Sequence, residues 1–283
     1  MAIRPAAAEY GIWFRRTDIV GADPLVAAHW DSVLPTKLCT KLVNEAGVSV
    51  STVEHVMAAL AGCGVHNAMI DIDGPEVPIL DGSAAAFVQA ILESGLQSLD
   101  APERAIEILE PIEVQNGAAR ARLDPAESLE IAFHIDFQDA AIGRQDKLLD
   151  MANGAFVREL CDSRTFCRQA DVDAMRASGL AMGGSLDNAV VVDGDRVLSP
   201  GGMRHADEPV RHKMLDALGD LALAGAPILG RYTGTRAGHA LTNLLLRTMF
   251  ARPGSFRMIT CDARTARRLP GVGIRAGDLR LVA

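Results

Sequence analysis

The sequence lacks an apolar stretch long enough to cross a bilayer. Charged residues or His interrupt its Ala- and Leu-rich segments before the roughly 18–20 residues that a spanning helix needs. Residues 1–9 contain one Arg and no apolar h-region, so they do not resemble a secretion signal. We therefore expect a soluble, cytoplasmic protein without a transmembrane segment.

Cysteines and basic residues are also scarce. The five cysteines include no C-x-x-C pair, which fits a reducing compartment and argues against a disulfide scaffold and against a thiolate zinc site. Only 28 Lys and Arg stand against 36 Asp and Glu, so the formal net charge is −8. Because neutralising phosphates needs a basic field, we expect no nucleic-acid partner. Four of the basic residues are lysines, namely Lys37, Lys41, Lys147 and Lys213.

The remaining composition is that of a globular protein, with 49% hydrophobic and 23% charged residues. A chain of 283 residues holds one large domain or two small ones, since domains typically run to about 100–200 residues. The apolar pattern lapses around residues 98–104, and a strand-rich stretch follows. We therefore predict two domains, residues 1–102 and 103–283.

Apolar periodicity predicts strands followed by helices in each half, which indicates an α+β fold with helices on one face of each sheet. Ser51 stands three residues before Glu54, the spacing of a capping box at a helix start. The predicted helices cover residues 51–62, 83–95, 148–160, 170–178, 208–223 and 238–250. The predicted strands cover residues 11–14, parts of 33–50, and 65–73, 106–114, 118–123, 128–137 and 189–192.

The predicted helix at 208–223 carries a polar stripe. His212, Asp216 and Asp220 follow one another at intervals of one helical turn, so they share a face. A His and a carboxylate one turn apart can bind one metal ion, although the same spacing is more common in surface ion pairs. From the spacing alone, both interpretations stay open.

A second ambiguous pair is Glu54 and His55. Glu54 either completes the capping box or lies beside a metal-bound water, with His55 as a third ligand; the two interpretations are compatible. Two His and one Asp would leave a fourth tetrahedral position for water, as in catalytic zinc sites. His239 follows Gly238 at a helix start, where it is either an exposed acid or bonded to the backbone.

The other four histidines have no such neighbours, and we expect them to be structural or surface residues: His29, His66, His134 and His205.

Six segments in order along nearly the whole chain resemble the UDP-3-O-acyl-N-acetylglucosamine deacetylase family of lipid A biosynthesis. They are STVEHV (51–56), DGPEVPILDGS (73–83), SRTF (163–166), GGSLDNAVVVD (183–193), RHKMLDALGD (211–220) and GHALTN (238–243). The resemblance implies a zinc amidohydrolase that removes the acetyl group from the 2-amino position of a UDP-linked, 3-O-acylated sugar. It also implies two two-layer α+β sandwich domains, like ribosomal protein S5 domain 2, packed helix face to helix face with the zinc between them.

The resemblance further assigns roles by motif position. His55, His212 and Asp216 would be the zinc ligands, and ferrous iron could use the same donors. Glu54 would be the general base and His239 the acid, held protonated by Asp220 because a neighbouring carboxylate favours imidazolium. Thr165 and Lys213 would stabilise the oxyanion.

The implied partner is a UDP-linked acylated amino sugar. Arg236 falls where the family carries a basic residue near the diphosphate, and its alternative interpretation is a solvated loop residue. Here Cys167-Arg168-Gln169 departs from the family pattern, which affects the acyl passage and not the reaction. We expect a monomer that approaches membranes only through its substrate. The acyl passage would be lined by Phe166, Val172, Leu180, Ala181, Ser185 and Val191.

The start of the chain departs from the family pattern. Family members have a strand and a Gly-x-Gly-Leu-His-Ser-Gly turn before the segment that matches Ile3-Arg4-Pro5. We expect a hairpin of on the order of 20–25 residues to be missing here. Because of the missing hairpin, an inactive UDP-sugar or acyl-chain binding protein with the same fold stays open as an alternative to the deacetylase. A second alternative is a different metal-dependent amidase on a similar scaffold.

Overall fold

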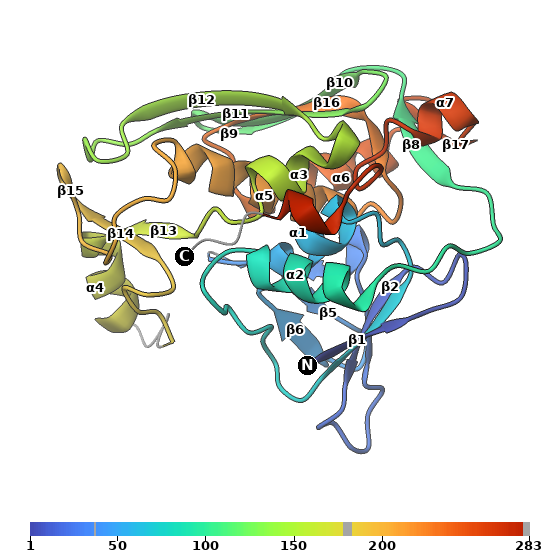
Figure 1. Ribbon diagram of the computed structural model, residues 1–283, viewed down its shortest axis with the longest axis horizontal. Coiled ribbons are helices and arrows are strands. Elements are labelled where there is room, and N and C mark those ends of the chain that lie inside the picture. The colour runs from blue at the N-terminus through green and yellow to red at the C-terminus, as the bar shows by residue number, and fades with distance from the viewer. Residues whose placement is uncertain (37, 178–182, 280–283) are drawn as a thin grey trace.

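The computed structural model describes residues 1–36, 38–177 and 183–279. Figure 1 shows helices lying between a large sheet and the smaller sheets of the N-terminal half. The α+β class predicted from the sequence is confirmed, whereas the division of the chain between residues 102 and 103 stays a prediction. Within the described residues, the longest helices are too short or too polar to be membrane spans.

The N-terminal half contains two small sheets. One has the strand order β1 (Ala2–Pro5), β7 (Ala68–Ile72), β2 (Ile12–Arg16) and β3 (Leu25–Ala27), with β7 parallel to β2. The other comprises β4 (Val33–Leu34), β5 (Lys41–Val43) and β6 (Ser49–Ser51). The helices of the N-terminal half are η1 (Trp30–Ser32), α1 (Glu54–Gly62) and α2 (Ala85–Ser94).

The C-terminal half is built on a seven-stranded sheet. Its central strand is β16 (Ile228–Thr235), which pairs with β10, β11 and β8. The other strands are β8 (Arg104–Ile108), β9 (Ile112–Asn116), β10 (Ala119–Pro125), β11 (Leu129–Asp136), β12 (Arg144–Asp150) and β17 (Phe256–Thr260).

A fourth sheet projects at one side of the molecule, beside α4 (Figure 1). It comprises β13 (Phe166–Arg168), β14 (Val190–Asp193) and β15 (Arg196–Val197), and α4 spans Gln169–Ala177. The remaining helices are η2 (Ala152–Gly154), α3 (Ala155–Glu159), α5 (Glu208–Ala222), α6 (His239–Phe250), α7 (Ala263–Ala266) and η3 (Ala276–Asp278).

Helix α5 is the centre of the helical layer. It contacts α1, α6 and β11, and therefore four of its polar residues are buried: Glu208, His212, Asp216 and Asp220. Gly219 permits the closest approach, because a Cβ at this position would lie 2.0 Å from the carbonyl oxygen of Glu54. This contact brings the first turn of α1 against α5, and one hydrophobic cluster continues through both halves of the chain.

Two of the sequence predictions about helices need correction. Ser51 does not start a helix, because it belongs to β6, its hydroxyl donates to the Pro75 carbonyl, and α1 begins at Glu54 without a side-chain cap. The helix predicted at 148–160 is reduced to α3, since residues 148–150 end the strand β12. Left-handed backbone at Asn153 and Gly154, with φ of 55° and 70°, separates the strand from the helix.

Candidate metal centre and active site

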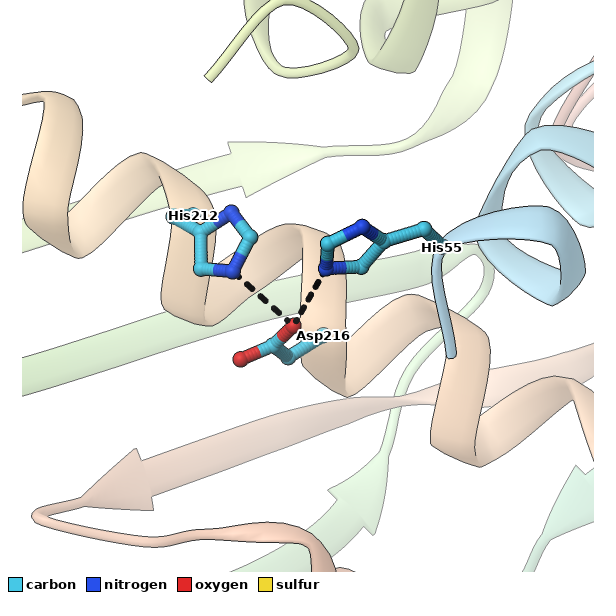
Figure 2. A group of neighbouring side chains, drawn as sticks. All are labelled: His55, His212 and Asp216. Carbon is cyan, nitrogen blue, oxygen red and sulfur yellow. Dashed lines mark ion pairs between the residues drawn. The ribbon is translucent and has the colours of Figure 1, made fainter. Parts of the chain in front are cut away.

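Three polar side chains from opposite halves meet between α1 and α5. His212 Nε2 lies 3.3 Å from Asp216 Oδ1, and His55 Nε2 lies 3.7 Å from the same oxygen (Figure 2). One ligand atom from each residue falls within 4.8 Å of the others, and all three residues are buried. The turn spacing on α5 thus places His212 and Asp216 together, and the α1–α5 contact adds His55.

The donor set and its protonation fit a divalent cation. His212 Nδ1 lies 3.0 Å from the carbonyl oxygen of Ser163, which can only accept, so this nitrogen carries the proton and leaves Nε2 free to ligate. Burial, with His212 beside it, lowers the pKa of His55 to about 3 and keeps the ring neutral. Two imidazole nitrogens and a carboxylate oxygen suit Zn²⁺ or Fe²⁺.

Asp216 completes the set as an ionised carboxylate. Burial by itself would raise the pKa of Asp216, but His212, Lys213 and His239 together lower it well below its usual value. Lys213 Nζ donates to Asp216 Oδ2 at 2.9 Å, so the ammonium group lies next to the metal cluster. Burial opposes the charge of Lys213, and Asp216 nevertheless raises the pKa of the lysine above its usual value.

Glu54 points into this site and is not part of a capping box. Its Oε2 accepts the backbone N–H of Thr40 at 3.0 Å, and its Oε1 lies 3.8 Å from His239 Nε2. Burial raises the pKa of Glu54 to about 7. A carboxyl group with this pKa can both take up and release a proton near neutral pH.

His239 is the first residue of α6 and faces Glu54 Oε1, whereas Thr40 contacts Glu54 Oε2. Its Nδ1 lies 2.9 Å from Asp220 Oδ2, and its Nε2 lies 3.9 Å from Asp216 Oδ2. Burial lowers the pKa of His239, but Asp220, Glu54 and Asp216 outweigh it and raise the value to about 10. The ring is therefore an imidazolium with Nε2 directed at the same space as Glu54.

Thr165 is held by main-chain contacts from both halves. Its N–H donates to the Gly82 carbonyl and its carbonyl accepts the Val190 N–H, both at 2.7 Å. Gly82 has φ of +84°, and a Cβ there would lie 2.0 Å from the Asn188 carbonyl oxygen, so only glycine fits this turn.

Sequence comparisons agree with this geometry. A family model described as UDP-3-O-acyl N-acetylglycosamine deacetylase matches residues 1–251 of the chain. The chain belongs to this deacetylase family. The resemblance inferred from the six motifs is therefore confirmed.

Three relatives named UDP-3-O-acyl-N-acetylglucosamine deacetylase illustrate the similarity. The one from Phenylobacterium zucineum is 53% identical over 260 residues, which cover 92% of this chain and 89% of that protein. The one from an Anaeromyxobacter species is 45% identical over 272 residues, 95% of this chain and 88% of that protein. The one from Shewanella oneidensis is 42% identical over 279 residues, 96% of this chain and 90% of that protein.

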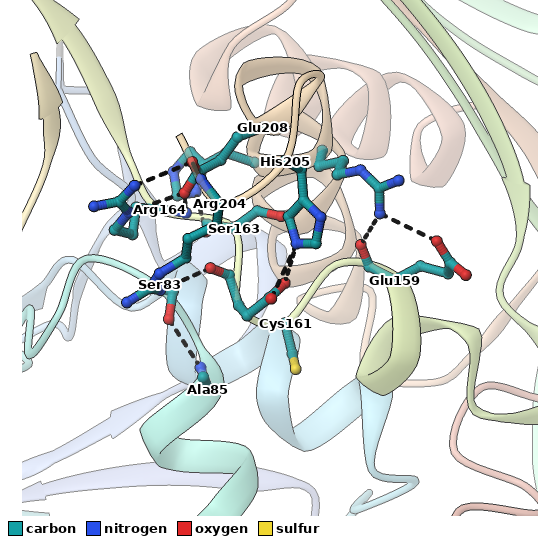
Figure 3. A network of polar contacts seen from close by, with 12 residues as sticks. Ser83, Ala85, Glu159, Cys161, Ser163, Arg164, Arg204, His205 and Glu208 are labelled. Carbon is teal, nitrogen blue, oxygen red and sulfur yellow. Dashed lines mark hydrogen bonds and ion pairs between the residues drawn. The ribbon is translucent and has the colours of Figure 1, made fainter. Parts of the chain in front are cut away.

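In this member of the deacetylase family, a buried ionic network supports the segment before Thr165 (Figure 3). Glu208 is fully buried one turn before His212, and its carboxylate accepts the N–H and Nε–H of Arg164, both at 2.9 Å. It also accepts the Arg204 N–H at 2.6 Å. The network fixes the loop whose Ser163 carbonyl meets His212. Arg164 stands in the SRTF segment and Glu208 begins a predicted helix, but the sequence patterns gave neither residue a role.

The structure separates the predicted substrate-binding residues. Phe166 lies edge-on to His212, with ring centroids 6.4 Å apart. Arg236 lies in the loop between β16 and α6, 46% exposed, and forms an ion pair with Asp136. Val191 is buried in β14, Ser185 is in an exposed loop, and Val172 is on α4. Leu180 and Ala181 lie outside the described residues.

The histidines that were expected to be structural or surface residues lie apart from the three-residue metal cluster, and each pairs with a carboxylate. The pairs are His29 with Asp31, His66 with Glu103, His134 with Asp146 and His205 with Asp162.

Proposed function

We propose that this protein hydrolyses the acetamide of UDP-3-O-acyl-N-acetylglucosamine, a step of lipid A biosynthesis, with His55, His212 and Asp216 holding Zn²⁺. The convergence of these residues with Glu54 and His239 in one buried site carries the proposal. The names of the relatives supply the substrate. Their coverage of nearly the whole chain counts against a protein that only binds the sugar.

The proton movements follow from the protonation states of two residues. A bound divalent cation would act as a Lewis acid that lowers the pKa of water and polarises the amide carbonyl. Glu54, with a pKa near 7, takes a proton from the attacking water as the C–O bond forms. His239 donates its Nε2 proton to the amine nitrogen as the C–N bond breaks, and the products are acetate and a free amino sugar.

Three further residues support these steps. Asp220 holds the Nδ1 side of His239, which directs Nε2 toward the leaving nitrogen. Lys213 and Thr165 are the proposed partners of the oxyanion, since positive charge and hydrogen-bond donors at that position stabilise the tetrahedral state.

Substrate contacts are proposed at two places. Arg236 would bind the diphosphate, and a phosphate oxygen would then have to replace the carboxylate of Asp136. Phe166, next to His212, would begin the acyl passage, with Ser185 and Val191 further along it. A cytoplasmic monomer stays a prediction, and the buried thiols of Cys63 and Cys161 are compatible with a reducing compartment.

Acetate release tests the proposal directly. The purified protein, loaded with one equivalent of Zn²⁺, should release acetate from UDP-3-O-acyl-N-acetylglucosamine, and metal analysis should find about one ion per chain. Tight binding of the UDP-sugar without acetate release would favour the binding protein and overturn the proposal. Release only from a different amide would favour the other amidase.

A further inference from the structure

Thr40 contacts the catalytic centre from a loop that no sequence motif marks. It lies between β4 and β5 and is 3% exposed. Its backbone N–H donates to Glu54 Oε2 at 3.0 Å, and its hydroxyl donates to Asp220 Oδ1 at 2.6 Å. One residue of the N-terminal half therefore reaches a carboxylate on α1 and a carboxylate on α5.

The two carboxylates belong to opposite ends of the proposed proton pathway. Glu54 is the base, and Asp220 uses its other oxygen, Oδ2, to hold His239 Nδ1 at 2.9 Å. Thr40 is thus linked through one contact to the base and through two contacts to the acid. Both carboxylates are buried, so water cannot readily replace a lost donor.

We propose that Thr40 is a positioning residue of the hydrolysis, which sets the separation of Glu54 and His239 by binding Glu54 and Asp220 at the same time. The inference rests on the proposed function. A carboxylate with one oxygen released can rotate and carry its partner imidazole with it, and a shift on the order of 1 Å in a reacting group can cost about 100-fold in rate.

The two arms of Thr40 can be separated by substitution. The contact to Glu54 comes from the backbone and survives a change of side chain. The contact to Asp220 comes from the hydroxyl, so Thr40→Val keeps the shape and removes this arm alone. Thr40→Ser keeps both arms. Ser128→Ala is a matched control, because it removes a buried hydroxyl that donates to Asp150 at 2.9 Å, outside the proposed site.

The test measures kcat and KM for acetate release, metal content and melting temperature on the Zn²⁺-loaded protein. We expect Thr40→Val to lower kcat by roughly 10- to 100-fold with KM and metal content unchanged. Thr40→Ser should restore kcat, and Ser128→Ala should leave it unchanged. Should the valine variant fail to fold, Thr40→Ala takes its place in the comparison.

A double substitution tests whether Thr40 acts through Asp220. If it does, Thr40→Val combined with Asp220→Asn should lose no more kcat than Asp220→Asn alone. Multiplied losses would overturn the proposal. So would normal kcat in Thr40→Val, or a loss of kcat that follows a loss of metal or of melting temperature.

Failure of the proposed function would look different. The unchanged protein would then release no acetate from the UDP-sugar, whatever Thr40→Val does, whereas retained release in Glu54→Gln and His239→Gln would overturn only the proposed roles of these two residues. Loss of release in these two variants, together with normal kcat in Thr40→Val, would overturn the role of Thr40 alone.

Discussion

The sequence around Glu54 allows two interpretations, a capping-box residue and a residue beside a metal-bound water, and the geometry of the structure fits only the second. Three residues after Ser51 it matches a capping box, yet its carboxylate turns away from the backbone of its own helix toward Thr40 and His239. Burial raises the pKa of Glu54, the imidazolium of His239 opposes this shift, and the carboxylates of Asp216 and Asp220 add to it. This balance keeps the pKa of Glu54 near neutrality, where a base is most useful.

We expect Glu54→Gln to abolish most of the activity while the metal stays bound. Gln has the shape of Glu and cannot take a proton, and loss of a general base typically costs ~10²–10⁴ in rate. Acetate release and metal content are measured on the same sample. Near-normal turnover in this variant would show that another group accepts the proton.

Asp71 gives a pH dependence that is independent of the active site. It lies on β7 between Arg4 and Arg15, and its carboxylate oxygens accept from both guanidinium groups at 2.7 Å. Hydrogen bonds from Arg15 and then Arg4 lower the pKa of Asp71 to about 2. The stabilisation is therefore present above the unfolded-state pKa of about 3.9 and is lost as the pH falls toward 2.

The matching prediction concerns Asp71→Asn. The variant should have a smaller free energy of unfolding than the unchanged protein at pH 7, and the difference should shrink as the pH is lowered below about 4. Urea denaturation at a series of pH values measures it. A difference that is independent of pH between 2 and 7 would contradict the assignment.

Among the elements, helices were the easier to predict. Apolar periodicity predicted the helices α1, α2, α4, α5 and α6. The strand β16 was not predicted, although it is the central strand of its sheet. Gly230 and Gly234 weaken its strand pattern. A Cβ at these positions would lie 2.7 Å from Ile108 and 2.6 Å from Phe133, so the glycines make room for neighbouring side chains that a local pattern does not reveal.

The strand β12 was mistaken for a helix start for another reason. It pairs with β11 and is otherwise an edge, with exposed and partly buried residues in alternation. The exposed positions of such a strand can hold apolar residues, which breaks the alternation of polar and apolar residues. Leu148, for example, is 53% exposed. The adjacent leucines 148 and 149 therefore read as one helix with the apolar residues of α3.

The contact of α1 with α5 predicts a strong effect of Gly219→Ala. A methyl group at this position overlaps the Glu54 carbonyl, so α1 must move and take Glu54 and His55 with it. Overpacking of this kind typically costs about 1–3 kcal/mol of stability. We expect a lower melting temperature together with reduced metal content and acetate release.

Gly277→Ala is the control for this variant, because a Cβ there meets nothing within 4 Å. It should melt and bind metal as the unchanged protein does. If Gly219→Ala behaved in the same way, the backbone contact between the helices would not determine the geometry of the site.

At the scale of the whole molecule, the proposed metal ligands come from both halves of the chain. His212 and Asp216 were predictable together because helical spacing fixes their separation. The contact of Thr40 with Asp220 spans 180 residues, and no local pattern encodes such a pairing. Helical spacing therefore predicted the part of the site that lies on one helix. The other site residues were predicted only through the family motifs.

Removal of the metal should therefore loosen the whole molecule. An ion that binds the folded state and not the unfolded state raises the free energy of unfolding, and this increase grows with the logarithm of the ion concentration. We expect a chelator to lower the melting temperature and added Zn²⁺ to restore it, in calorimetry with parallel metal analysis. His55→Ala should respond weakly to both additions. An unchanged melting temperature after verified metal loss would contradict a role of the ion in joining the halves.

The contact at Gly219 also bears on how such a site can change over generations. The genetic code offers no side chain between hydrogen and methyl, so the distance between α1 and α5 cannot be widened here by small increments. A mutation of the Gly219 codon therefore either keeps glycine or adds at least a methyl group that overlaps the Glu54 carbonyl. We therefore expect a change of substrate or ion preference to arise from the side chains around the helix pair and not from the spacing of the two helices.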